Sequence, residues 1–292
     1  LHEYLMSLNP HQLATELIEG VIMKKDNLSK FLSKQRYALM PLHNFFFTRD
    51  SSVSMYDKIL ISRMASNVRD RESIIMETIY DFSNQIGGTT FNPVDNRCAK
   101  QELKIEGGDV LVARDDILLV GNGSRTSSQG IDFLIDRFKR EKKKQHILVQ
   151  ELPKSPESFI HLDMVFTFLD KNQVMTFNPL IFRSSKYITI HITIDNGEVS
   201  IREEDNLVTA LKNLGMDVEA VPCGGDNDIY IQEREQWHSG ANFFAIGPGK
   251  VIGYERNVHT IETLNKKGYE VLKAKDIIRG KINTEDYQKY VI

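Results

Sequence analysis

A repeated unit constrains the fold of this chain more than any other feature of its sequence. Each copy predicts a strand, a tight turn, a second strand and usually a helix, and the copies start near residues 44, 108, 161 and 242. One hairpin with its helix cannot bury its own apolar faces, whereas several copies packed around a common axis can. The sequence therefore predicts an α/β fold, either a ring of blades or a closed barrel-like array. In both, functional side chains from distant copies converge at one end of the axis.

Turn residues separate the predicted elements. Strand pairs are expected at residues 44–50 with 58–62, 108–112 with 117–121, 161–169 with 174–177, and 242–246 with 251–254. Helices are expected over residues 70–84, 131–138 and 206–214, and in a segment that stops at Gly268. Strict alternation predicts a further strand over residues 187–194, where His191 is interpreted as a strand-surface residue rather than a ligand.

Residues 159–166 place two titratable side chains among apolar neighbours and are predicted to form a buried strand. Alternate side chains of a strand share a face, so His161 and Asp163 are expected to point the same way. Such a pair could shuttle a proton and anchor a cationic substrate. The alternative interpretation is a hydrogen-bonded histidine of the core.

Residues 1–40 have helical spacing of their apolar side chains, and Asn27 or Ser29 is expected to cap a helix. We predict a packed helical subdomain without catalytic residues here, and we assign residues 41–292 to the repeats.

Composition narrows the classes of partner. The formal net charge of -3 gives no reason to expect nucleic acid or an anionic membrane. The two cysteines, Cys98 and Cys223, form no disulfide framework, which suits a reducing compartment. The sequence has no apolar run of membrane-spanning length and no signal-peptide pattern at its start. We therefore expect a cytoplasmic protein.

Polar residues cluster beside the first strands of the repeats, and two arginines follow second strands. They are Asn44, Arg49, Asp50, Glu106, Asp109, His161 and Asp163, with Arg69 and Arg125. Together they would suit a zwitterionic ligand with a planar cation, because carboxylates pair with guanidinium groups and arginines pair with carboxylates. Phe47 could cover the flat cation with its ring. The glycines between Glu106 and Asp109 permit a tight bend, although an ordinary turn explains them equally.

Other ligands are poorer interpretations. His161 and Asp163 alone are too few for a metal site, and residues 226–228 open like a calcium loop but lack its downstream spacing. The basic run over residues 137–144 is interpreted as a solvated helix end rather than a nucleic-acid site.

Four motifs, at residues 44–50, 106–109, 161–163 and 234–237, resemble those of bacterial arginine deiminases in order and spacing. The resemblance implies the pentein fold, a five-bladed ββαβ propeller with a helical insertion after its first blade. By this resemblance, residues 1–40 are the end of the insertion and residues 41–292 are propeller blades.

The resemblance also implies roles for single residues. Asp50 and Asp163 match the carboxylates that grip the substrate guanidinium, and Glu106 and His161 match the proton-handling pair. Arg69 and Arg125 match arginines that hold the α-carboxylate, with Asn44 assisting and Phe47 lining the pocket. The implied activity is that of a hydrolase that converts L-arginine to L-citrulline and ammonia through a cysteine-thiol intermediate, without metal or organic cofactor.

The chain departs from the family pattern at both ends. The family's nucleophilic cysteine lies in a glycine- and arginine-rich loop that this sequence lacks, and the first blade is missing too. Neither Cys98, in a polar loop, nor Cys223, before two glycines, is expected to replace it. We therefore expect a truncated deiminase that is inert as printed. Its uncovered strand edge and blade faces predict low stability or self-association, hence a homo-oligomer.

Two alternatives remain open. One is a deiminase or amidinotransferase for a related guanidine compound, although the pair Arg69 and Arg125 favours a substrate with a free carboxylate, hence arginine over agmatine. The other is a non-catalytic arginine-binding or interaction protein that keeps the pocket without the nucleophile.

Overall fold

The computed structural model describes residues 1–93, 102–182 and 187–292, and it divides into two compact units. The N-terminal unit comprises Leu1–Lys100 and the C-terminal unit Gln101–Ile292. The described residues form five separate open sheets, and none of these sheets closes on itself. The predicted α/β class is therefore confirmed, while a closed barrel is not what the described strands form. None of the described helices combines the length and apolarity needed to cross a membrane.

The N-terminal unit starts with short helices and a two-stranded antiparallel sheet. These elements are α1 (His2–Met6), α2 (Pro10–Glu19), β1 (Val21–Ile22), α3 (Leu28–Leu32) and β2 (Tyr37–Leu39). Asn27 caps α3 as expected, since its side chain accepts the backbone N–H of Lys30. None of the residues in these three helices is buried.

The first ββαβ motif completes the N-terminal unit. It consists of α4 (Thr48–Ser51), β3 (Ser52–Met55), β4 (Lys58–Ile61), the 3₁₀ turn η1 (Asn67–Arg69), α5 (Asp70–Phe82) and β5 (Thr89–Phe91). Strands β3 and β4 are antiparallel, and β4 pairs in parallel with β5 after the helical crossover. The strand predicted over residues 44–50 is wrong, because a turn and α4 occupy this segment and the strand begins at Ser52.

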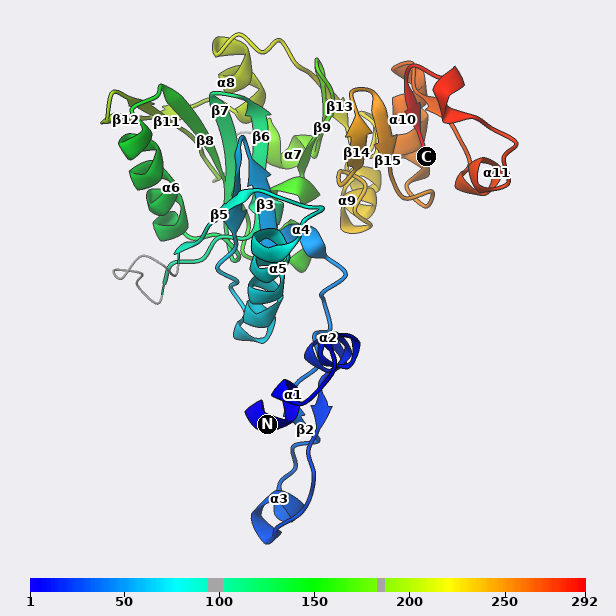
Figure 1. The fold of residues 1–292 in the computed structure, drawn as a ribbon. Coiled ribbons are helices and arrows are strands. Elements are labelled where there is room, and N and C mark those ends of the chain that lie inside the picture. Colours follow the sequence, from blue (N-terminus) through cyan, green and yellow to red (C-terminus); the bar gives the residue numbers. More distant parts are fainter. Residues whose placement is uncertain (94–101, 183–186) are drawn as a thin grey trace. The chain divides into compact units, whose positions relative to one another are not determined.

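The C-terminal unit contains a five-stranded sheet in the order β12-β11-β8-β7-β6. Its elements are β6 (Val110–Arg114), β7 (Ile117–Asn122), α6 (Ser128–Glu141), β8 (Gln145–Glu151), β11 (Thr189–Asp195) and β12 (Glu198–Glu204). Strands β6 to β8 repeat the ββαβ pattern, because β6 and β7 are antiparallel and β7 and β8 are parallel. Figure 1 shows α6 alongside this sheet.

The next motif is split by the β11–β12 hairpin. It is built from β9 (Phe166–Asp170), β10 (Gln173–Thr176), α7 (Asn178–Ile181), α8 (Leu207–Asn213) and β13 (Glu219–Pro222). Strand β10 pairs antiparallel with β9 and parallel with β13. Leu207 and Leu211 of α8 pack in one core cluster with Leu148 of β8 and Phe166 of β9, which ties the two sheets together.

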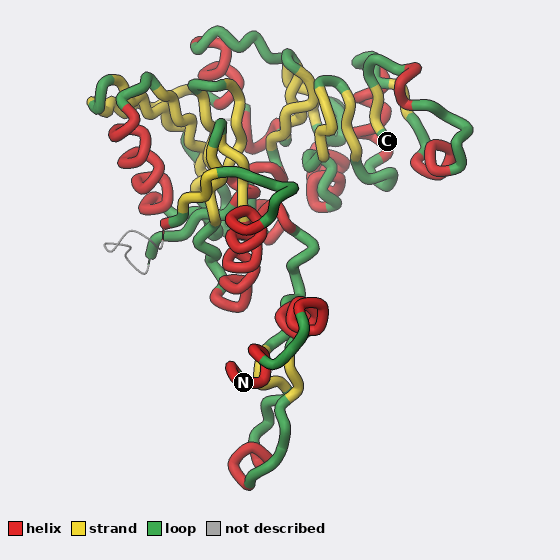
Figure 2. Tube along the Cα trace, viewed as in Figure 1, coloured by secondary structure: helices red, strands yellow, loops and turns green. Residues whose placement is uncertain are grey.

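The last motif follows α9 (Ile229–Trp237). Its elements are β14 (Phe244–Gly247), β15 (Lys250–Ile252), α10 (Val258–Lys266), β16 (Glu270–Val271), α11 (Ala274–Ile278), η6 (Thr284–Asp286) and β17 (Tyr290–Val291). Strand β15 pairs antiparallel with β14 and parallel with β17. Figure 2 shows the strands of the C-terminal unit flanked by helices, as the repeat predicted.

Residues 159–166 do not form the predicted strand. They form the end of η4 (Glu157–Phe159), a short link, and η5 (Leu162–Met164), and β9 begins only at Phe166. The backbone N–H groups of Met164 and Val165 donate to His161 and Leu162 within the turn rather than to a neighbouring strand. The apolar pattern arises because Leu162 and Val165 enter the core from a turn, so alternation of faces does not apply to His161 and Asp163.

Candidate active site

A buried acid–histidine pair forms the centre of the site in the C-terminal unit. Nε2 of His161 lies 2.9 Å from Oε2 of Glu106, and both side chains are almost completely buried. The other oxygen, Oε1, lies 3.8 Å from Nη1 of Arg125, whose side chain is partly exposed. The Glu106 carboxyl group thus lies between an imidazole and a guanidinium.

The glycine pair after Glu106 brings this carboxylate to His161. Residues Gly107–Asp109 form the 3₁₀ turn η3, in which the N–H of Asp109 donates to the carbonyl of Glu106. A Cβ added to Gly108 would lie 2.6 Å from Cγ of His161, so the imidazole packs directly on this glycine. The predicted tight bend is confirmed, and the group that approaches it closely is the imidazole of His161.

Asp109 lies at the end of the same turn and is fully buried. Its Oδ1 accepts the backbone N–H of Leu162 at 2.9 Å. Burial raises the pKa of this carboxyl to about 7, although the nearby His161 imidazole acts in the opposite direction. Asp163 follows in η5 and is partly exposed.

The N-terminal unit groups three other predicted residues around Arg69. Its Nη1 lies 2.7 Å from Oδ2 of Asp50, and its Nη2 approaches the backbone oxygens of Asn44 and Phe47 at 3.4 and 3.5 Å. The side chain of Phe47 is half exposed and packs against the tilted ring of Phe46, with ring centroids 4.1 Å apart. Arg69 therefore organises the turn that carries Asp50.

Glu72 is a member of this group that sequence reasoning missed. Its two carboxylate oxygens accept hydrogen bonds from Nε and Nη2 of Arg69 at 3.0 and 2.8 Å. Burial lowers the pKa of the Arg69 guanidinium, but its hydrogen bonds to Glu72 and Asp50 outweigh that effect and raise the pKa above its ordinary value. The i, i+3 spacing of Arg69 and Glu72 at the start of a predicted helix is the signal that could have found this pair.

The motif at residues 234–237 supports the His161 turn. The Nε2 of Gln236 donates to the backbone oxygens of Ser158 and Met164, at 2.6 and 3.3 Å, on the two sides of His161. Glu235 instead caps α10, because its carboxylate accepts the backbone N–H groups of His259 and Thr260. Both functions are structural.

Cys223 has the environment of a core thiol. It is buried, and burial raises the pKa of its thiol to about 12. A thiol with so high a pKa carries almost no thiolate at neutral pH. Cys98 lies outside the described residues.

His191 is not the surface residue that the sequence predicted. It is buried, its Nε2 lies 2.9 Å from Nδ1 of His146, and its Nδ1 lies 3.0 Å from Oε1 of Glu204. Burial lowers the pKa of both imidazoles. Neighbouring strands β8 and β11 bring them together, a pairing that the alternation of one strand does not reveal.

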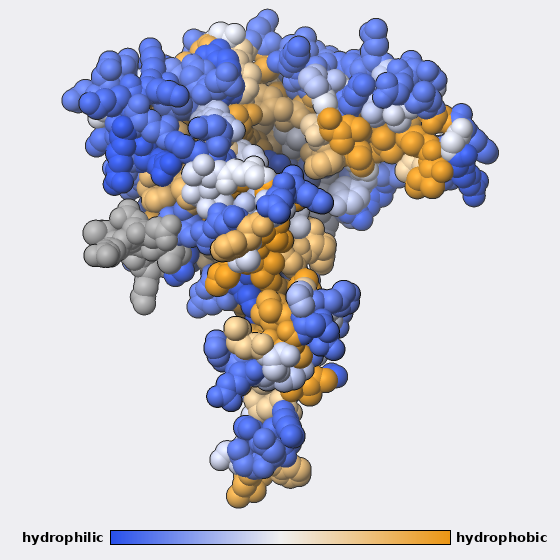
Figure 3. All heavy atoms as spheres, in the orientation of Figure 1, coloured by the Kyte–Doolittle hydropathy of each residue, from blue (hydrophilic) through white to orange (hydrophobic). Residues whose placement is uncertain are grey.

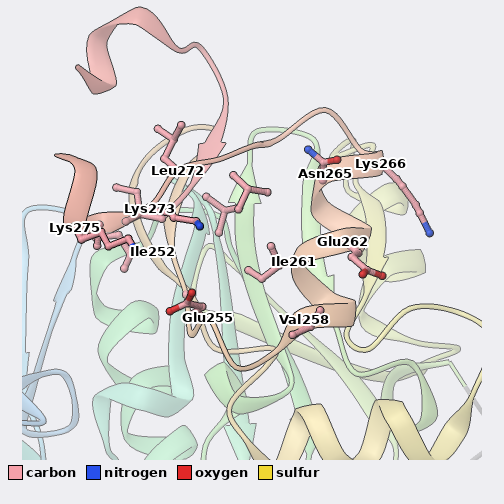
Figure 4. A pocket seen from close by; sticks show the side chains of 15 residues that line it. Ile252, Glu255, Val258, Ile261, Glu262, Asn265, Lys266, Leu272, Lys273 and Lys275 are labelled. Carbon is pink, nitrogen blue, oxygen red and sulfur yellow. The ribbon is translucent and has the colours of Figure 1, made fainter. Parts of the chain in front are cut away.

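A separate pocket of about 650 Å³ lies in the last motif (Figure 4). Apolar side chains such as Ile252, Ile261 and Leu272 line it, together with the charged side chains of Glu255 and Lys273. Figure 3 shows hydrophobic surface over this part of the C-terminal unit, where Phe244 and Ile252 are among the exposed apolar residues. The pocket contains none of the predicted site residues.

Within each unit by itself, the described residues include no group of three metal-ligating side chains close enough to share an ion. That the activity implied by the family resemblance needs no metal or organic cofactor stays a prediction.

Comparison with solved structures defines the class of fold. An amidinotransferase of saxitoxin biosynthesis from Microseira wollei aligns with a TM-score of 0.52 and 15% identity, covering 80% of this chain and 64% of that chain. A dimethylarginine dimethylaminohydrolase adduct with S-methyl-L-thiocitrulline aligns with a TM-score of 0.50 and 16% identity, covering 88% and 87%. The ββαβ motifs thus give this chain the α/β fold of these enzymes.

Sequence comparison identifies the family. A family model described as arginine deiminase matches residues 10–281. The arginine deiminase of Listeria welshimeri is 33% identical over 300 residues, covering 96% of this chain and 71% of the relative. That of Bacillus cereus strain B4264 is 32% identical over 298 residues with the same coverage. The chain belongs to the arginine deiminase family, and the resemblance noted in its motifs is confirmed.

Proposed function

We propose that this chain serves the hydrolysis of L-arginine to L-citrulline and ammonia in the cytoplasm. The observation that carries the proposal is the buried 2.9 Å contact between His161 and Glu106 in a chain of the arginine deiminase family. A carboxylate beside an imidazole stabilises the imidazolium, so His161 can hold a proton for the leaving ammonia and then take one from water. Catalysis of this kind needs both protonation states of one positioned group.

The roles of single residues in substrate binding are assigned from the family resemblance. Asp50 and Asp163 are the carboxylates for the guanidinium, and Arg69 and Arg125, with Asn44, serve the α-carboxylate, while Phe47 lines the pocket. The partly exposed Arg125 suits this role, because a guanidinium binds a carboxylate through paired hydrogen bonds. A substrate with a free carboxylate is therefore favoured, so arginine should bind more tightly than agmatine.

The nucleophile is assigned to a cysteine other than Cys223. In the proposed reaction a thiolate attacks the guanidinium carbon, the C–N bond to ammonia breaks, and water then releases citrulline and the thiol. A buried thiol with a pKa of about 12 is unsuited to this step. The alternative, a non-catalytic arginine-binding protein, would bind arginine without turning it over.

The finer architecture is part of the same proposal. The described residues form four ββαβ motifs, one in the N-terminal unit and three in the C-terminal unit, which support blades of a five-bladed pentein propeller. Residues 1–40 are assigned to a helical insertion and residues 41–292 to the blades.

The test is isothermal titration of the chain with L-arginine and agmatine, together with a colorimetric citrulline assay. Asp50→Asn and Asp163→Asn should each weaken arginine binding by about tenfold or more, since each removes a charge-assisted hydrogen bond. The matched control is Asp132→Asn, which changes an exposed carboxylate of α6. Equal binding of arginine by wild type and both site variants would contradict the proposal, as would citrulline formation that depends on Cys223.

A further inference from the structure

We propose that Asp109 is a positioning residue that holds His161 against Glu106. This inference rests on the proposed function, because it assigns a role within the same acid–histidine site. Asp109 belongs to the same motif as Glu106, but the proton-handling and substrate-binding roles assigned above leave it without one. Its geometry supplies that role.

One 3₁₀ turn holds His161 at two points. Glu106, immediately before η3, contacts Nε2 of the imidazole, and Asp109, the last residue of η3, accepts the backbone N–H of Leu162 at 2.9 Å. Leu162 directly follows His161 and is fully buried in the main core cluster. The ring and the backbone of the histidine segment are therefore fixed to the same short turn, which restricts rotation of the imidazole away from Glu106.

Two glycines let these groups pack closely. The imidazole of His161 lies on Gly108, and a Cβ added to Gly121 of β7 would lie 2.4 Å from Oδ1 of Asp109. The carboxyl oxygen that binds Leu162 thus has β7 backbone directly behind it. Such close packing leaves Asp109 little freedom to change its rotamer, so the acceptor stays aimed at the Leu162 amide.

The carboxyl also couples electrostatically to the site. Asp109 is fully buried, and His161 favours its charged form while Asp163 disfavours it. By the same interaction, Asp109 favours the protonated imidazole above a pH of about 7, where its own carboxyl is charged. Replacing the carboxyl by an amide would keep an acceptor oxygen for Leu162 and remove the charge, so two variants can separate the two effects.

The test uses NMR of the whole chain and needs no substrate. In Asp109→Ala, the Leu162 amide should exchange with solvent about tenfold faster than in wild type, since a buried hydrogen bond is lost, while amides of β7 should keep their protection. In Asp109→Asn, the Leu162 amide should stay protected, and the fraction of His161 that is protonated above about pH 7 should fall. Asp132→Asn should change neither signal.

The outcomes distinguish this inference from its premise. Unchanged Leu162 exchange in Asp109→Ala, or an unchanged fraction of protonated His161 above about pH 7 in Asp109→Asn, would overturn it. If Asp109→Ala does not fold, the titration of Asp109→Asn still decides. Arginine titration of the wild type tests the proposed function separately, because a chain that fails to bind arginine can still show both NMR effects.

Discussion

The buried carboxyl of Asp109 predicts an unusual dependence of stability on pH. Its pKa rises from an ordinary 3.8 to about 7 on folding. Between these values the folded protein holds a proton that the unfolded chain has released, so the free energy of unfolding falls as pH rises. Above both values the penalty is complete and amounts to about 4 kcal/mol.

The variant Asp109→Asn has no carboxyl to titrate, so its free energy of unfolding should not fall with pH for this reason. The difference in unfolding free energy, variant minus wild type, should therefore grow by about 4 kcal/mol between about pH 4 and about pH 8, and stay level outside that range. Urea unfolding measured by fluorescence suits the C-terminal unit, because the single tryptophan, Trp237, belongs to it.

The exposed-site variant Asp132→Asn provides the control, and its curve should run parallel to that of the wild type. A difference between Asp109→Asn and wild type that does not change with pH would refute the reasoning. So would a difference that shrinks as pH rises, because that sign requires a carboxyl stabilised in its charged form.

Three further predictions follow from close contacts. Gly108→Ala should destabilise the C-terminal unit by about 1–3 kcal/mol and weaken arginine binding, because the new methyl group meets the His161 ring; urea unfolding and calorimetry measure the two effects. Glu235→Ala should cost about 2 kcal/mol in urea unfolding, because it leaves the first N–H groups of α10 uncapped, and an effect near zero would contradict the capping role. Cys223 should resist iodoacetamide at about pH 8 in the folded chain and react in urea, as peptide mass mapping would show; fast labelling of folded protein would contradict its buried, protonated state.

The repeat was predictable from the sequence because hairpins and helices leave local patterns. The predicted helix over residues 70–84 corresponds to α5, and the strands at 117–121 and 187–194 correspond to β7 and β11. These patterns depend only on spacing within one element. The pairing of Glu106 with His161 also followed from motif order, through the family resemblance.

The errors arose where distant groups decide the local structure. Residues 159–166 read as a strand, yet the Leu162 amide bonds to a carboxyl 53 positions earlier in the chain. His191 looked exposed because its partner His146 lies on another strand. Glu72 went unnoticed because charged residues early in a helix usually lie in solvent, whereas this one is buried against Arg69.

The β11–β12 hairpin has a consequence for how the polypeptide is assembled during synthesis. Strand β11 pairs with β8 of the five-stranded sheet. Strand β10 precedes the hairpin in the chain, but its parallel partner β13 follows the hairpin. Two sheets are therefore interleaved along the sequence, and the second remains incomplete until Pro222 has left the ribosome. Because long-range pairings of this kind form slowly, the middle of the C-terminal unit should fold as one block and late, rather than motif by motif as translation proceeds.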